Sequence, residues 1–176
     1  MSQVEVDKII PQSGTTLTVG DSGDTVTFTS GANLSVDGTI KLDGNYPTGT
    51  ENVALGNTAL DSVQSGGNYN VAIGSSSLTT LTTGDNNTAV GFESLKVNTA
   101  NNNTAIGWCS MVANTTGASN TAIGLTSLDA NTTGGDNVAV GVAALSANTT
   151  GDNNTAVGHR ALIAATTANN NTALGR

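Results

Sequence analysis

The sequence predicts an all-β fold, a parallel β-solenoid (β-roll) of about eight coils that stack on one another. Three observations predict it. A phrase of the form Asn-(Thr/Val)-Ala-(Val/Ile/Leu)-Gly occurs eight times, with glycines spaced 16 to 18 residues apart at Gly56, Gly74, Gly91, Gly107, Gly124, Gly141, Gly158 and Gly175. A large apolar residue follows each of the first seven glycines by four positions: Leu60, Leu78, Leu95, Met111, Leu128, Leu145 and Leu162. Aromatic residues make up only 3 % of the chain and charged residues 10 %, which is unsuited to one rounded core built from bulky side chains.

Two regions are expected along the chain. Residues 1–50 contain short segments with alternating apolar residues, separated by turn residues, and this pattern predicts short β-strands. The alternating pairs are Leu17/Val19, Val26/Phe28, Leu34/Val36 and Ile40/Leu42. A turn-rich stretch at 43–50 predicts the boundary, so 1–50 is a small β-rich N-terminal region and 51–176 is the repeat shaft.

The first part of each coil is a short strand, as residues 120–124 illustrate. Alternation places Thr121 and Ile123 on one face of the strand, and Asn120, Ala122 and Gly124 on the other. Positions equivalent to Ile123 are always apolar, so we expect that face to line the interior of the coil. The opposite face carries Ala and Gly in every copy, which predicts that another subunit packs there and that the chain forms a homotrimer about the rod axis.

The rest of each coil is expected to turn back toward the next strand. Residues 125–128 predict a single helical turn or tight loop whose Leu128 closes the coil. Residues 131–134, Asn-Thr-Thr-Gly, have the composition of a turn. Differences in coil length fall in this turn section, where insertions are tolerated.

The leading asparagine of each phrase predicts a structural ladder. Stacked coils would place these residues above one another, and a buried Asn can bond the backbone of adjacent coils through both ends of its amide. The predicted ladder residues are Asn52, Asn70, Asn87, Asn103, Asn120, Asn137, Asn154 and Asn171.

Charge and hydropathy argue against two classes of partner. The formal net charge is −8, and there are only five Lys and Arg residues, so binding to a nucleic-acid backbone is not expected. No apolar run is long enough to insert into a membrane. The first residues lack a basic stretch followed by an apolar one, so we expect no secretory signal and synthesis in a cytoplasm.

The sequence does not predict an enzyme. His159 is the single histidine and Cys109 the single cysteine, so nucleophile–base arrangements and metal sites lack partners. The carboxylates of the repeat region are scattered, mostly in loops. We therefore expect no catalytic residue, no cofactor and no bound metal.

One series of larger apolar residues stands out, at the position that follows the repeat glycine. Phe92, Trp108, Leu125 and Val142 occupy it in four successive coils, with Asn57 and Ser75 before them and His159 after them. Such a stripe could stack against a sugar or bind a protein, and packing between subunits is the interpretation we favour.

The phrases at 87–95, 130–134 and 154–162 resemble the shaft repeats of bacteriophage tail fibres and related virion fibres. More distantly, they are similar to the head repeats of trimeric autotransporter adhesins, which form trimeric left-handed parallel β-rolls. The run at 6–27 resembles the opening of structural and tail-fibre proteins of marine phages.

This resemblance implies a non-enzymatic phage virion protein. It would be a homotrimeric fibre that attaches to tail or capsid proteins through residues 1–50 and projects outward for host adsorption or virion decoration. Phage fibres usually end in a distal tip, whereas residues 171–176 supply one strand of an eighth coil. We therefore expect either that a capping or distal fibre protein binds there or that the rod is short and is not the receptor-binding tip. The expected location is the virion surface, on tail or capsid, after synthesis in the host cytoplasm.

Two other functions remain open from the sequence. The chain could be a fragment of a bacterial trimeric surface adhesin head. It could also be an ice-binding solenoid, because the pairs Thr115/Thr116, Thr132/Thr133 and Thr149/Thr150 are expected to stack. An ice-binding array must be flat and unbroken, and the series is expected to lapse at 98–100 and at 164–167.

Overall fold

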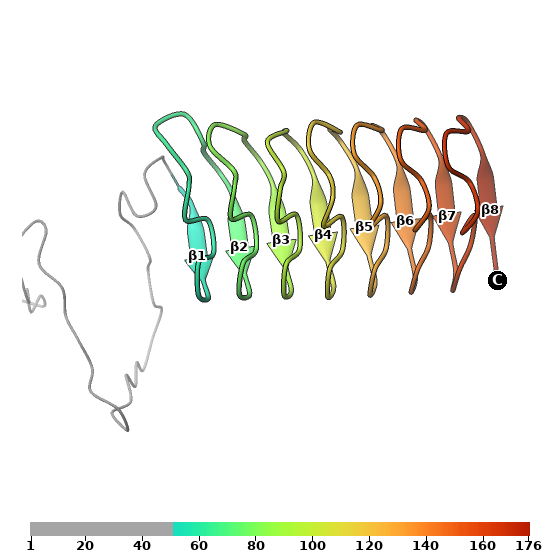
Figure 1. The fold of residues 1–176 in the computed structure, drawn as a ribbon, viewed down its shortest axis with the longest axis horizontal. Helices are drawn as coiled ribbons and strands as arrows, with labels where there is room; N and C mark the ends of the chain where they lie inside the picture. The colour runs from blue at the N-terminus through green and yellow to red at the C-terminus, as the bar shows by residue number, and fades with distance from the viewer. Residues whose placement is uncertain (1–50) are drawn as a thin grey trace, which may run out of the picture. The chain divides into compact units, whose positions relative to one another are not determined.

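The computed structural model of the protein describes residues 51–176, so the predicted region 1–50 and its boundary lie outside the described residues. Eight three-residue strands stand side by side in chain order (Figure 1). They are β1 (Val53–Leu55), β2 (Val71–Ile73), β3 (Thr88–Val90), β4 (Thr104–Ile106), β5 (Thr121–Ile123), β6 (Val138–Val140), β7 (Thr155–Val157) and β8 (Thr172–Leu174).

Every strand pairs in parallel with the next one, in the register that the repeat predicts. β5 pairs with β6 through Thr121 with Val138, Ala122 with Ala139, and Ile123 with Val140. Turns connect the strands, and residues 51–176 contain no helix. The predicted fold class, an all-β parallel solenoid with about 17 residues per coil, is confirmed for this part of the chain.

The prediction of which strand face points inward was wrong. Ala122 is fully buried in the coil, whereas Ile123 is 38 % exposed. The same holds for its neighbours, because Ala72, Ala89, Ala105, Ala139 and Ala156 are also fully buried. These alanines share one core with the leucines of the following turn, and the coil has room for only a methyl group beside each leucine. Small residues therefore serve the interior of the coil rather than a contact with another subunit.

The repeat glycine lies at a corner where the coils approach closely. Gly124 has φ +140°, a value that side-chain-bearing residues rarely adopt. A Cβ atom placed on it would lie 2.5 Å from the carbonyl oxygen of Gly141 in the next coil. Glycine is therefore required here by contact within the chain as well as by backbone conformation.

After the glycine the chain makes a tight turn, and the alternative of a helical turn was wrong. Thr126 and Leu128 have φ +48° and +53°, in the left-handed region that bulky residues avoid. Stacking offsets this strain, since Leu128 is fully buried and its N–H donates to Ala144 O in the next coil at 3.0 Å. As expected, the side chain of Leu128 is buried in the interior of its own coil.

The eight leading asparagines lie above one another and bond from coil to coil. The Oδ1 atom of Asn120 accepts from the backbone N–H of Asn137 at 3.0 Å and from its Nδ2 at 3.1 Å. The Nδ2 atom of Asn120 donates to Gly134 O at 2.8 Å. The backbone rung recurs from the first pair, Asn70 N to Asn52 Oδ1, to the last, Asn171 N to Asn154 Oδ1. The buried amides thus replace backbone bonds that the strand ends lack.

A second asparagine ladder runs through the interior, at positions where the sequence predicts only a turn. Its members are the fully buried Asn98, Asn114, Asn131 and Asn148. Asn131 Nδ2 donates to Asn114 Oδ1 at 2.7 Å and to Gly134 O at 2.9 Å. Ala165 holds the equivalent place in the next coil, and Asn148 Oδ1 accordingly has no hydrogen-bond partner. Amide pairs therefore fill space that Leu81 fills in the second coil.

Candidate interaction surface

The last residue of each strand forms an apolar row on the outside of the solenoid, which we name the outer strand row. Leu55 is 49 % exposed, Ile106 39 % and Ile123 38 %. The whole row consists of Leu55, Ile73, Val90, Ile106, Ile123, Val140, Val157 and Leu174. It carries no charge in any coil, so water faces a continuous line of branched aliphatic side chains.

The predicted stripe forms a second exposed row, which we name the corner row: Phe92, Trp108, Leu125 and Val142. Their exposed fractions are 43 %, 53 %, 48 % and 43 %. The rings of Phe92 and Trp108 stack with centroids 6.2 Å apart and planes inclined by 15°. Adjacent coils thus present a stacked aromatic pair that is formed within one chain.

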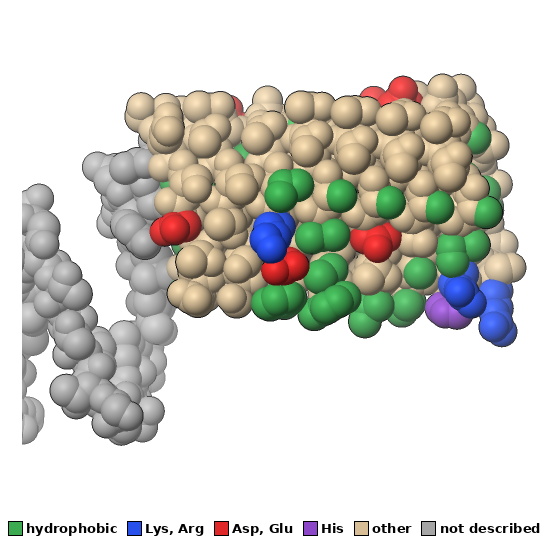
Figure 2. Space-filling model, in the orientation of Figure 1, with side chains coloured by type: hydrophobic (Ala, Val, Ile, Leu, Met, Phe, Trp, Pro, Cys, Tyr) green, Lys and Arg blue, Asp and Glu red, His purple; other side chains and the backbone are tan. Residues whose placement is uncertain are grey.

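Both rows belong to one surface, which we name the apolar face. Only the repeat glycine separates the two rows in sequence, so their Cα atoms are at most about 7 Å apart in each coil. Figure 2 shows hydrophobic side chains gathered along the lower margin of the middle coils. Contiguous exposed apolar surface of this kind marks interaction sites on soluble proteins.

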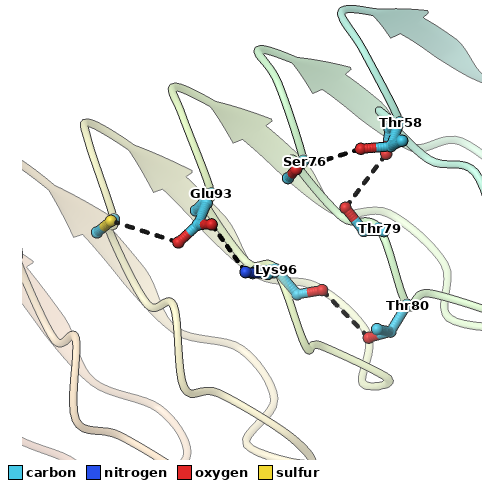
Figure 3. Close-up of polar contacts among 7 residues, drawn as sticks. Thr58, Ser76, Thr79, Thr80, Glu93 and Lys96 are labelled. Atoms are coloured by element: carbon cyan, nitrogen blue, oxygen red, sulfur yellow. Dashed lines mark hydrogen bonds and ion pairs between the residues drawn. The ribbon is translucent and has the colours of Figure 1, made fainter.

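Polar contacts beside the corner row tie neighbouring coils together (Figure 3). Within one coil Lys96 Nζ lies 2.7 Å from Glu93 Oε1, and the sulfur of Cys109 in the next coil lies 3.9 Å from Glu93 Oε2. In the first coils, Thr58 Oγ1 and Ser76 Oγ share a hydrogen bond of 3.2 Å. The carboxylate of Glu93, next to Phe92, is therefore already paired within the chain.

Cys109 is a buried free thiol, and its surroundings suppress ionisation. Burial raises its pKa above the ordinary 9.0, and the negative charges of Glu93 and Asp129 raise it further. The thiolate is the reactive form of cysteine, so the thiol of Cys109 reacts slowly with electrophiles at neutral pH.

We predict that iodoacetamide alkylates Cys109 more slowly at pH 8 than it alkylates a cysteine in a short peptide. A raised pKa leaves less thiolate at that pH, and burial hinders access. Mass spectrometry of the alkylated chain gives the rate directly because the chain has one cysteine. Glu93→Gln should speed the reaction, and a native rate equal to that of the peptide would contradict the assignment.

Asp129 is a partly buried carboxyl group whose Oδ1 atom has no hydrogen-bond partner. Burial raises its pKa above 3.8, and backbone N–H groups of Asp129 and Ala130 offset part of this rise. A folded-state pKa above the unfolded value means that the charged form weakens the fold. The penalty is present above the raised pKa and is relieved as pH falls through it.

We therefore predict that Asp129→Asn raises the melting temperature at pH 7 and leaves it almost unchanged near pH 3. The amide removes the charge that burial disfavours, and at low pH the native carboxyl is neutral as well. Thermal melts followed by circular dichroism across that range test the difference. A variant that is equally stabilised at both pH values would show that charge is not the cause.

The turn carboxylates serve coil stacking. Asp85 Oδ1 accepts from Asn68 N at 2.8 Å, and Asp152 Oδ1 accepts from Gly135 N at 2.8 Å. Within residues 51–176, no three His, Cys, Asp or Glu side chains form a group that could hold a metal ion. His159 lies on the surface, at the end of the lane that contains the corner row.

The threonine rows differ from the expectation in one place. Thr149 N donates to Thr166 O at 2.7 Å, so the series continues through 164–167, where a lapse was expected. The shorter coil at 98–100 has a single threonine, and the second row is interrupted there. Hydroxyls of the first row bond within the chain, as in the donation from Thr115 Oγ1 to Thr132 O at 2.8 Å.

No protein-family model, no curated protein and no solved structure matches this chain. Among residues 51–176, no helix has the length and apolar character required to cross a bilayer.

Proposed function

We propose that the chain is a non-enzymatic structural protein of a bacteriophage virion. It acts as a homotrimeric fibre, with residues 1–50 attached to tail or capsid proteins and residues 51–176 forming a shaft that projects outward for host adsorption or decoration. The observation that carries the proposal is the apolar face on an array whose strands, turns and asparagines bond mainly to one another.

The size of the apolar face supports self-association. An aromatic side chain covers roughly 200 Å² and an aliphatic one roughly 100 Å² when buried. At the observed exposures of 37 % to 53 %, the large residues of coils 1–6 leave roughly 500 Å² of apolar side chain in water. A stable interface covers roughly 800 Å² on each partner, a little over half of it apolar. The face therefore has the apolar content of one subunit interface, about half of what the two contacts of a subunit in a ring of three would use.

The arrangement of the two rows is compatible with a closed ring such as a trimer. A closed cyclic assembly requires each subunit to present two different surfaces, one to each neighbour. The corner row can lie nearest the ring axis, where it meets the same residues of both neighbours, and the outer strand row beside it can extend the contact. This replaces the contact through Ala and Gly that was expected from the sequence, because those residues are buried within the coil.

Sequence resemblance supports the virion assignment. The repeat phrase at 154–162 resembles phage fibre shafts, and the run at 6–27 resembles the opening of marine phage structural proteins. An adhesin head would share the trimer, whereas ice binding would require free threonine hydroxyls on an unbroken array. The internal donation by Thr99, Thr115, Thr132 and Thr149 makes the ice-binding alternative weaker.

Native mass spectrometry of the purified chain tests the assembly, and gene context tests the virion role. Three chains of 17.4 kDa should give a particle of about 52 kDa. The flanking genes should encode capsid, portal or tail proteins, and immunogold labelling should place the chain on phage particles. A monomer would overturn the trimeric fibre. A trimer encoded among secretion and anchor genes would instead favour the adhesin.

A further inference from the structure

We propose that the corner row is the register contact of the trimer, where Phe92, Trp108, Leu125 and Val142 of each subunit pack on the same residues of its neighbours. This inference rests on the proposed trimer and adds where the copies meet and how they align along the shaft.

The two rows differ in whether they can fix the alignment of one subunit against the next along the shaft. The outer strand row is apolar in all eight coils, so sliding one subunit by a coil would exchange one aliphatic contact for another. The corner row is not periodic, because Ser75 precedes it and His159 follows it. A slide by one coil would place a polar side chain of one subunit against an apolar one of the next. The aligned arrangement avoids this cost.

The aromatic pair suits an interface between identical chains. Trp108 and Phe92 are stacked before any partner binds, so little side-chain freedom is lost on association. Aromatic anchors of this kind carry much of the energy of protein interfaces. No member of the row is charged, so copies of it do not repel one another.

A sugar or a charged protein is a less suitable occupant of the corner row. Sugar binding combines ring stacking with several hydrogen bonds, but Trp108 is flanked in its row by Phe92 and Leu125. The nearby carboxylate of Glu93 is engaged by Lys96 at 2.7 Å. The surroundings of the ring therefore offer apolar contact and little polar recognition.

Trp108 is the only tryptophan of the chain, so its fluorescence reports on the corner row alone. It is 53 % exposed within one subunit. In the full-length trimer we expect blue-shifted emission and several-fold weaker quenching by acrylamide than in the urea-unfolded chain. Quenching in the trimer that equals quenching in the unfolded chain would overturn the proposal.

A disulfide test measures alignment. In a Cys109→Ser background, Leu125→Cys should form a covalent dimer when oxidised by copper-phenanthroline in air, with two thiols losing two protons and two electrons to the oxidant. A disulfide needs Cβ atoms about 4 Å apart, whereas a one-coil slide separates equivalent residues by at least about 4.8 Å. Thr133→Cys, at an exposed turn position outside the apolar face, is the control and should remain monomeric on denaturing gels.

Assembly variants separate this inference from the proposed function. Leu125→Asp should reduce the native mass to that of one chain with unchanged circular dichroism, while Thr133→Asp should remain trimeric. A native trimer that persists with Leu125→Asp, or that yields no Leu125→Cys dimer, would overturn the inference and leave the fibre proposal standing. A monomeric native chain would overturn both.

Discussion

Gly124→Ala is expected to destabilise the shaft by about 4 kcal/mol or more. The new Cβ would lie 2.5 Å from Gly141 O and 2.6 Å from Gly141 C, and neither backbone atom can move without displacing the next coil. The alanine would also hold φ near +140°. Thermal or urea unfolding followed by circular dichroism should show the loss.

Gly66→Ala is the matched control for this substitution. Gly66 also has a positive φ, +117°, but an added Cβ would meet no atom within 4 Å. Only backbone strain remains, so we expect a loss of about 1–2 kcal/mol. Equal losses at the two sites would show that contact between coils is not what requires glycine at the corner.

Asn120→Ala is expected to cost about 2–4 kcal/mol, because it breaks one rung of the ladder in a fully buried site. The backbone N–H of Asn137 would lose its acceptor, and the side chain of Asn137 would lose a second contact to the same atom. Gly134 O would keep one donor, Asn131 Nδ2, so the loss falls mainly on Asn137. Urea unfolding at constant protein concentration measures the change.

Two variants bracket that result. Asn57→Ala removes an exposed amide of the same chain and should change stability by less than about 0.5 kcal/mol. Asn120→Asp keeps the acceptor for Asn137 N but cannot donate to Gly134 O at neutral pH. It should therefore be destabilised as well, and more so when charged. If Asn120→Ala were as harmless as Asn57→Ala, the ladder would be a consequence of stacking and not a cause.

Periodicity predicted the coil, the strand phrase and the closing leucine because each depends on stacking alone. A repeat that places Leu128 over Leu145 does so whatever the shape of one coil. The strand face could not be assigned in the same way. Alternation shows that Ala122 and Ile123 point to opposite sides, but it does not show how wide the interior is.

The narrow interior of the coil explains why the inward face of the strand was wrongly predicted and why the outer strand row was not predicted. Leu128 fills the interior across from Ala122, so a branched side chain at Ala122 would not fit. Ile123 is therefore turned outward, and the outer strand row becomes part of the apolar face. The corner row was visible in the sequence as a stripe, because its residues differ in size from those in the other coils.

The second asparagine ladder could have been predicted from residue spacing, although not from residue type. Asn114, Asn131 and Asn148 each lie three residues after the closing Leu or Met, and each is followed by Thr-Thr-Gly. Turn preference explains asparagine at such a place without burial. Its constant distance from the closing residue was the feature that indicated an inward position.

The amide-filled interior has a consequence for heat and cold. Exposure of apolar groups on unfolding raises the heat capacity, and exposure of polar groups lowers it. Asn114 and Asn131 occupy, far from solvent, places that most domains give to hydrocarbon. The heat-capacity increment per residue should therefore be small, and the stability curve broad and shallow. The free energy of unfolding of such a shaft would therefore change little between about 0 °C and physiological temperature.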